Sequence, residues 1–221
     1  MKLAIFNGSP RGEKSNTRIL VDEFLKGFII DESNSYELEY LCNVKEQDKF
    51  VQMFKTADSV ICAFPLYTDS MPGIVKEFIE SLSVFKNGKN NPKIGFIVQS
   101  GFPEGIHTKA VEKYFIKLAW RLKCEYLGTV RKGGVEGIKA MPPAATKKLF
   151  KKFQELGEHF GRTGKFKQEI IDKLSKPDKF NSLLICPVVA LLKITGLLDM
   201  HWNKVLKQNN AFEKRYDKPY L

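Results

Sequence analysis

Cysteine pairs of the kind that hold zinc or iron–sulfur clusters are missing from this 221-residue chain. Its four cysteines are widely spaced, and no two of them form a C-x-x-C pair. We therefore expect no metal site and no cluster-based electron transfer. Most of these cysteines lie in apolar runs, and the start of the chain shows no signal-peptide pattern. We expect buried, reduced thiols in a cytoplasmic protein.

Long apolar runs are missing as well. The most hydrophobic stretch, LLICPVVALL at 183–192, has ten residues and is interrupted by Pro187, whereas a membrane span needs about 20. No transmembrane segment is therefore expected. We expect the apolar segment at 183–198 to lie at a subunit interface, most simply that of a homodimer. Burial in an irregular core, part of an acceptor pocket and contact with a membrane surface remain alternatives.

Acidic residues are too few to balance the basic ones. The chain has 36 Lys and Arg against 25 Asp and Glu, which gives a formal net charge of +11. This excess favours an anionic partner, whether a phosphorylated cofactor, nucleic acid or an acidic membrane. The densest basic group fits one solvated helix face at 147–152, and no nucleic-acid-binding motif accompanies it. We expect no nucleic-acid partner.

Short apolar runs alternate with amphipathic segments along most of the chain. The predicted strands are 2–6, 36–41, 59–64, 93–99 and 125–131, and helical patterns lie at 19–29, 48–56, 74–82 and 111–122. This alternation predicts a single α/β domain over 1–221, with a five-stranded parallel sheet and helices on both faces. The pattern at 142–221 predicts a helical C-terminal extension. It comprises a basic helix at 144–160, a polar stretch, the apolar 180–198 and a polar, aromatic tail.

The loop after the first predicted strand, FNGSPRGEKSNT at 6–17, fails two nucleotide-binding motifs. A triphosphate loop needs its second glycine directly before the lysine, where Glu13 stands, and the dinucleotide fingerprint needs a third glycine. What remains is a set of donors at a predicted helix N-terminus: Ser9, Arg11, Ser15, Asn16 and Thr17. We expect these donors to bind a monophosphate. The alternative is that Ser15 or Asn16 only caps the helix.

Two further loops follow the third and fourth predicted strands, at the edge where open parallel sheets bind ligands. They read PLYTDSMP at 65–72 and SGFPEG at 100–105. Together with the phosphate site they indicate a mononucleotide with a large planar ring, although Tyr67 and Met71 could equally pack on the core. The histidines His107, His159 and His201 show no partner pattern, and we assign no catalytic residue.

Several motifs resemble those of one family. GSPRGEKSNT is similar to the phosphate loop of the flavodoxin-like NAD(P)H-dependent FMN reductases, and PLYTDSMPGIVKEFIE is similar to their P-L-Y-x-x-x-x-P-x-x-x-K-x-F segment. SGFPEGIH and WNKVLKQNNAFEKRYDKPYL resemble stretches of clostridial-type members, here without an iron–sulfur cysteine motif. The resemblance covers essentially the whole chain. It implies a flavodoxin-like fold, bound FMN, NADH or NADPH as hydride donor, and a small-molecule electron acceptor such as a quinone, a nitro or azo compound, or a flavin.

The resemblance also implies roles for individual residues. The FMN phosphate is expected at Ser9, Arg11, Ser15, Asn16 and Thr17, and the isoalloxazine ring is expected beside Pro65, Leu66, Tyr67 and Thr68, with Gly101, Phe102 and Glu104 near its other edge. One alternative is a flavodoxin-like electron carrier without its own NAD(P)H activity, although such carriers usually present an acidic face. Another is an interaction protein on an empty scaffold, because fold does not fix function.

Overall fold

The computed structural model describes residues 1–86, 88, 90–181, 186–187, 191, 195–196 and 199–218. The chain divides into two compact units, Met1–Lys179 and Phe180–Leu221. Most of the apolar segment at 183–198, where we expect a subunit interface, lies outside the described residues. Among the helices that are described, none is long and apolar enough to span a bilayer.

Five parallel strands form the sheet of the first unit. They are β1 (Lys2–Asn7), β2 (Ser35–Tyr40), β3 (Ser59–Pro65), β4 (Lys93–Gln99) and β5 (Tyr126–Lys132), in the order β2-β1-β3-β4-β5. The predicted parallel sheet is confirmed, and every strand end lies within a residue of its predicted place. Because β1 pairs with both β2 and β3, the direction of sheet growth reverses beside β1. The carboxyl ends of β1 and β3 are therefore the expected place for a ligand.

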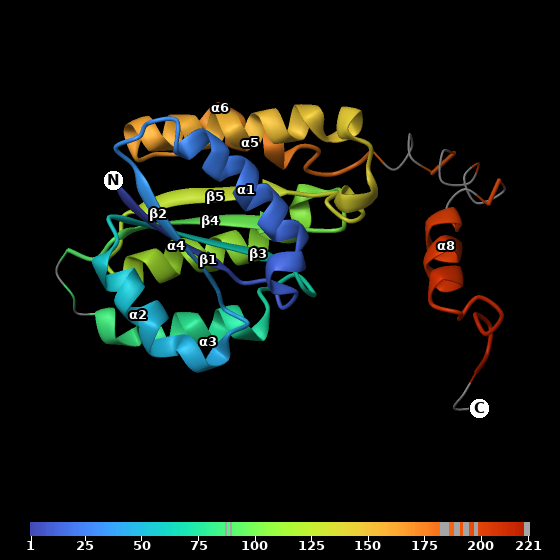
Figure 1. Ribbon diagram of the computed structural model, residues 1–221, viewed down its shortest axis with the longest axis horizontal. Helices are drawn as coiled ribbons and strands as arrows, with labels where there is room; N and C mark the ends of the chain where they lie inside the picture. Colours follow the sequence, from blue (N-terminus) through green and yellow to red (C-terminus); the bar gives the residue numbers. More distant parts are fainter. Residues whose placement is uncertain are drawn as a thin grey trace. The chain divides into compact units, whose positions relative to one another are not determined.

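Helices cover both faces of the sheet, as predicted (Figure 1). One face carries α1 (Asn16–Phe28), α5 (Pro143–Thr163) and α6 (Gln168–Ser175), and the other carries α2 (Gln47–Thr56), α3 (Gly73–Ser81) and α4 (Lys109–Arg121). Helix α6 was not predicted, because its residues were assigned to a polar stretch. This helix buries Ile170, Ile171 and Leu174 against the same core as α1 and α5. In the second unit, α8 spans Met200–Gln208.

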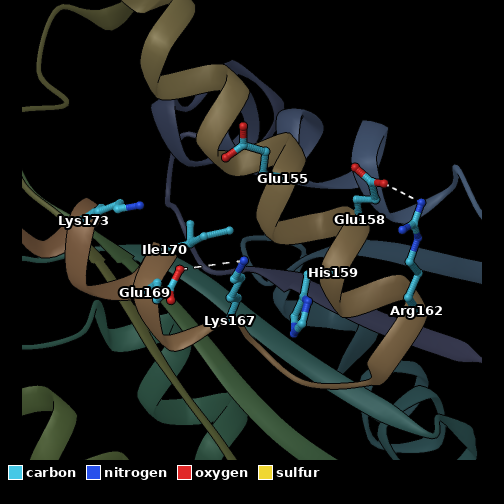
Figure 2. A pocket seen from close by; sticks show the side chains of 8 residues that line it. All are labelled: Glu155, Glu158, His159, Arg162, Lys167, Glu169, Ile170 and Lys173. Carbon is cyan, nitrogen blue, oxygen red and sulfur yellow. Dashed lines mark ion pairs between the residues drawn. The ribbon is translucent and has the colours of Figure 1, made fainter.

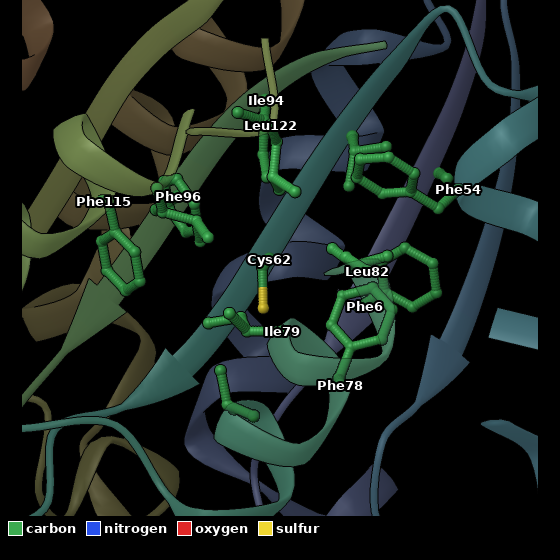
Figure 3. Close-up of a cluster of buried hydrophobic side chains, with 14 of the residues drawn as sticks. Phe6, Phe54, Cys62, Phe78, Ile79, Leu82, Ile94, Phe96, Phe115 and Leu122 are labelled. Atoms are coloured by element: carbon green, nitrogen blue, oxygen red, sulfur yellow. The ribbon is translucent and has the colours of Figure 1, made fainter. Parts of the chain in front are cut away.

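The core lies in two layers because successive strand residues point to opposite faces of the sheet. In β1, Leu3 and Ile5 face α1 and α5, whereas Ala4 and Phe6 face the other helices. Figure 3 shows this second layer. In it the ring of Phe96, on β4, stacks on the ring of Phe115, on α4, with ring centroids 3.7 Å apart. Ring contacts also join Phe6 of β1 to α3 and Phe64 of β3 to α4.

The four cysteines are free thiols in different surroundings. Burial raises the pKa of the Cys62 thiol far above its ordinary value and that of Cys124 to about 12. These two therefore match the expected buried thiols. Cys42 is only partly buried, however, and Cys186 is exposed.

Two glycines bring α1 and α5 together. A Cβ atom on Gly27 would lie 1.9 Å from the carbonyl oxygen of Gln154, and one on Gly157 would lie 1.9 Å from that of Phe24. Real Cβ contacts are never this short, so the two helix backbones approach as closely as they do only because both positions lack side chains. This contact fixes α1, whose first turn contributes to the candidate site.

Candidate functional site

Loops from four neighbouring strands meet at the carboxyl edge of the sheet. Backbone hydrogen bonds join them in sequence: Gly8 N–H donates to Ala63 O at 2.8 Å, Leu66 N–H to Gln99 O at 2.7 Å, and Ser100 N–H to Lys132 O at 3.0 Å. A cleft of about 60 Å³ lies among these loops, lined by Ser9, Arg11, Asn16, Pro65, Leu66, Tyr67, Gln99, Ser100, Gly101 and Glu136. Six of the ten lining residues are polar or charged, so the enclosed part of the site suits a polar group.

Two glycines determine the path of the loop between β1 and α1. A Cβ on Gly8 would lie 2.2 Å from Cγ2 of Val75, so the loop packs directly on α3. Gly12 has a φ of +52°, a left-handed conformation that favours glycine, and its N–H donates to Ser9 O at 3.0 Å. The chain then passes through the short helix η1 (Gly12–Lys14) into α1. The first N–H groups of α1, which begins at Asn16 in the cleft lining, have no partner within the helix and can bind a ligand there.

Two buried hydroxyls near the start of α1 already accept hydrogen bonds. Ser15 is the N-cap of α1, and its Oγ accepts from Arg18 N–H at 3.1 Å and from Asn7 Nδ2 at 3.2 Å. Thr17 Oγ1 accepts from Gln99 Nε2 at 3.3 Å. Because a hydroxyl has one proton besides its lone pairs, both groups remain able to donate.

Ser9, earlier in the same loop, is a third buried hydroxyl that accepts a hydrogen bond. Its Oγ accepts from Arg11 N–H at 3.4 Å, and its own N–H donates to Asn7 Oδ1 at 3.0 Å. Arg11 lines the cleft and is exposed to solvent. Three hydroxyl donors, a guanidinium and the positive end of a helix form a donor set that suits a phosphate group.

Asn16 ties a fourth loop to the site. Its Nδ2 donates to Val135 O at 3.1 Å, and Val135 N–H donates to Ser100 O at 3.0 Å. These bonds hold the loop after β5 beside the cleft, so that Glu136 lines it. The side-chain amide of Asn16 thus positions a neighbouring loop, while its backbone N–H lies in the first turn of α1.

The turn after β3 is strained. Tyr67 and Ser70 exchange backbone hydrogen bonds of 2.9 and 3.0 Å, and the two residues between them, Thr68 and Asp69, have φ values of 48° and 59°. Left-handed backbone at non-glycine positions is unfavourable, and its presence at a ligand site is a common sign of function. Asp69 Oδ1 lies 3.3 Å from His107 Nδ1.

The loop after β4 meets this turn through His107. The imidazole packs against the ring of Phe102 with centroids 5.0 Å apart, and its Nε2 lies 3.9 Å from Glu104 Oε2. Phe102 is 64% exposed. Because the Phe102 ring is so exposed at the carboxyl edge of the sheet, it is available for contact with a planar group.

The predicted binding residues fall into three groups. Those that line the cleft are Ser9, Arg11, Asn16, Pro65, Leu66, Tyr67 and Gly101. Ser15 and Thr17 lie behind it in the buried network, and Thr68, Phe102 and Glu104 lie in the two loops but outside the cleft lining. Three further lining residues, Gln99, Ser100 and Glu136, were not predicted individually, although Ser100 belongs to the predicted loop at 100–105. Gln99 had a signal, since it is a polar residue at the end of an otherwise apolar strand.

A separate cavity of about 270 Å³ lies between α5 and α6 (Figure 2). Its lining includes three glutamates, one arginine, two lysines and a histidine, and two ion pairs are present: Glu158 with Arg162 at 2.6 Å and Lys167 with Glu169 at 3.8 Å. The balanced charge gives it no preference for an ionic ligand. Within the described part of the chain, no group of three or more His, Cys, Asp or Glu side chains could hold a metal ion.

Comparison with known proteins identifies the family. Residues 1–129 match the model of the NADPH-dependent FMN reductase family, and the chain belongs to this family. The search of curated proteins found no match. The predicted resemblance is confirmed, and the protein is an NAD(P)H-dependent FMN oxidoreductase.

Solved structures share the fold at low sequence identity. An FMN-dependent NADH-azoreductase from Bacillus anthracis, in complex with FMN, is 17% identical with a TM-score of 0.56, over 73% of this chain and 100% of that one. An NADPH-quinone reductase from P. pentosaceus is 21% identical with a TM-score of 0.50, over 70% and 96% of the two chains. A flavone reductase is 13% identical with a TM-score of 0.59, over 73% and 62%. The fold is therefore flavodoxin-like, as predicted.

Proposed function

We propose that the cleft at the carboxyl edge of the sheet binds FMN by its phosphate and that the protein passes electrons from NAD(P)H to a small acceptor. When bound, FMN supplies the redox chemistry by accepting electrons from the nicotinamide and passing them on. The chain's own residues bind and orient this group. No side chain is required as nucleophile or general base.

Three buried hydroxyls, one in the cleft lining and two at the start of α1, are the observation that carries the phosphate assignment. Ser9, Ser15 and Thr17 are nearly inaccessible to solvent, yet each accepts a hydrogen bond and keeps a proton to donate. Buried hydroxyl donors need an acceptor, and a phosphate at the start of α1 would provide one. The position of these hydroxyls beside the first turn of α1 agrees with a phosphate there.

The ring is proposed to lie between the loops after β3 and β4. Pro65, Leu66, Tyr67 and Thr68 would border one edge, and Gly101, Phe102 and Glu104 the other. The strained turn at Thr68 supports this assignment, as does the exposed ring of Phe102. This arrangement leaves one ring face open, so that NAD(P)H and the acceptor can use it in turn.

The acceptor class is proposed from chemistry and from the relatives. The similar structures are described as an azoreductase, a quinone reductase and a flavone reductase. Quinones, azo or nitro compounds and free flavin are all planar molecules that can stack on an exposed flavin face. We therefore propose acceptors of this kind here.

One experiment tests the proposal. The FMN-loaded protein is reduced anaerobically with NADH and, separately, with NADPH, and loss of flavin absorbance is followed. A quinone, an azo dye, a nitroaromatic compound and FMN are then added one at a time. Rapid reoxidation by at least one of them is expected. Reduction without reoxidation by any small acceptor would overturn the proposed acceptor class while leaving the family intact.

Three features of the whole protein are also proposals. A single functional domain over 1–221 is proposed although the chain divides into two compact units, and a cytoplasmic location is supported by the four free thiols. A homodimer through the apolar segment at 183–198 is supported by its hydrophobicity. Sedimentation velocity at micromolar concentration tests the dimer, and a monomer there would refute it. Val189→Asp should give a folded monomer if this segment forms the interface.

A further inference from the structure

A second and larger hollow borders α1, α5 and the loop between β5 and α5. It has a volume of about 990 Å³, within the range of roughly 300–1,000 Å³ typical of small-molecule sites. None of its lining residues belongs to the cleft described above. We call it the α1–α5 groove. It lies wholly within the first unit of the chain and has no role in the proposed binding of FMN.

The base of the α1–α5 groove is apolar. Ile19 and Phe150 are partly buried and pack on the core shared by α1 and α5, and Ile138 is buried beside them. Met141, at the end of the β5–α5 loop, is 42% exposed and belongs to the lining. The groove thus offers several apolar side chains for an apolar body to cover.

The rim of the groove is basic. Four lysines contribute to the lining, and they are Lys26, Lys139, Lys147 and Lys151. Lys139 Nζ donates to Lys14 O, and Lys151 lies 3.9 Å from Glu155 on the adjacent turn. Within the described residues, Lys147 takes part in no ion pair. At least one ammonium group therefore lacks a counter-charge.

The one acidic residue in the lining does not balance these lysines. The Glu23 side chain is only 9% exposed, and both of its oxygens are already used. Oε1 accepts from Lys26 Nζ at 2.6 Å, and Oε2 accepts from Gln154 Nε2 at 2.6 Å. The groove therefore combines an apolar base with a net positive rim.

We infer that the α1–α5 groove binds a small amphipathic anion, a molecule with one carboxylate, sulfate or sulfonate group on an apolar body. The apolar body would cover Ile19, Met141 and Phe150, and the anion would lie near Lys147. Charge complementarity favours this occupant over a second copy of the chain, because two copies of the same basic rim would repel each other. The inference is independent of the FMN assignment.

Calorimetry on the FMN-loaded protein tests the inference with decanoate kept below its micelle concentration. We expect one saturable site for decanoate and binding at least about tenfold weaker for decyltrimethylammonium, which has the same chain and the opposite charge. Acetate, which has the anion without the apolar body, should show no saturable binding. Equal binding of all three, or no binding of decanoate, would overturn the inference.

A pair of adjacent lysines on α5 supplies a matched control. Lys147 and Lys148 are both exposed, but only Lys147 lines the groove. Lys147→Glu should weaken decanoate binding at least about fivefold, whereas Lys148→Glu, with the same change in net charge, should alter it less than about twofold. Equal effects would indicate non-specific attraction and would refute the site. A decanoate-dependent change of oligomeric state would likewise overturn it, since a second copy would then occupy the groove.

Discussion

Replacing Thr17 by valine tests the phosphate assignment with little change of side-chain shape. Thr17 is 0% exposed, and its Oγ1 accepts from Gln99 Nε2 at 3.3 Å. Valine has no proton to donate to a phosphate. A hydrogen bond to a charged group contributes about 1.5–3 kcal/mol, which corresponds to an FMN affinity lower by about 10- to 150-fold.

The assay compares two ligands that differ only in the phosphate. The apoprotein is titrated with FMN and with riboflavin, and quenching of flavin fluorescence gives each dissociation constant. If Thr17 contacts the phosphate, Thr17→Val should weaken FMN binding and leave riboflavin binding almost unchanged. The ratio of the two constants thus separates loss of this contact from a general disturbance of the site.

The variant also leaves the buried Gln99 amide without its partner, so a matched control is needed. Thr129 is equally buried, and its Oγ1 is hydrogen-bonded to Tyr126 Oη at 2.6 Å, away from the cleft lining. Thr129→Val should lower the free energy of unfolding by a comparable amount, about 1–3 kcal/mol, without changing FMN affinity. A folded Thr17→Val protein with the wild-type ratio of FMN to riboflavin affinity would refute the reasoning.

Three further changes have defined outcomes. Phe102→Ala should shift the absorbance of bound FMN but hardly lower the apoprotein Tm, because the ring is 64% exposed; an unchanged flavin spectrum would contradict its place beside the ring. Gly157→Ala should lower the Tm despite a gain of about 1 kcal/mol in helix propensity, because its Cβ would lie 1.9 Å from a carbonyl oxygen of α1. Gly73→Ala, where nothing lies within 4 Å, is the control, and equal effects would argue against the close helix contact. Burial raises the pKa of Cys124 from 9.0 to about 12, so the unfolded state loses this proton first and stability falls as pH rises from 9 toward 12. Cys124→Ala should make that fall shallower in urea unfolding, and an identical slope would exclude the thiol as its cause.

Three of the strands, β1, β3 and β4, could be predicted closely because a buried parallel strand is nearly all apolar. The run at 59–64, for example, is β3 (Ser59–Pro65), and every residue of that strand is buried. Such runs end where polar loop residues begin, so their ends are visible in the sequence. The alternation of strands and helices then fixes the parallel sheet.

The helix α6 was missed for a physical reason. It has eight residues, and Gln168, Glu169, Asp172 and Lys173 make it polar on average. Its buried apolar residues are only Ile170, Ile171 and Leu174, a helical pattern that is too short to stand out from a polar stretch. The helix is stabilised by packing on the core, and packing is a tertiary effect that local patterns do not contain.

The site was predicted in part for a related reason. Its loops after β1, β3 and β4 follow directly from the rule for parallel sheets, but the loop after β5 was not considered. That loop reaches the cleft because a Cβ on Gly133 would lie 2.5 Å from Pro103 O, which means that the two backbones are in contact. Glu136 therefore enters the cleft through a close approach that only the folded chain creates.

From the sequence, Ser15 was expected either to cap the helix or to bind a phosphate. The geometry of its hydroxyl makes the two roles compatible. Capping uses the lone pairs of Ser15 Oγ, which accept from Arg18 N–H and Asn7 Nδ2. Binding an anion would use the proton, which is a different part of the same hydroxyl. Because both lone pairs of Ser15 Oγ accept hydrogen bonds, the hydroxyl can interact with a further group only by donating its proton. A residue that caps the helix in this way is thereby prepared to donate to an anion at the same helix end.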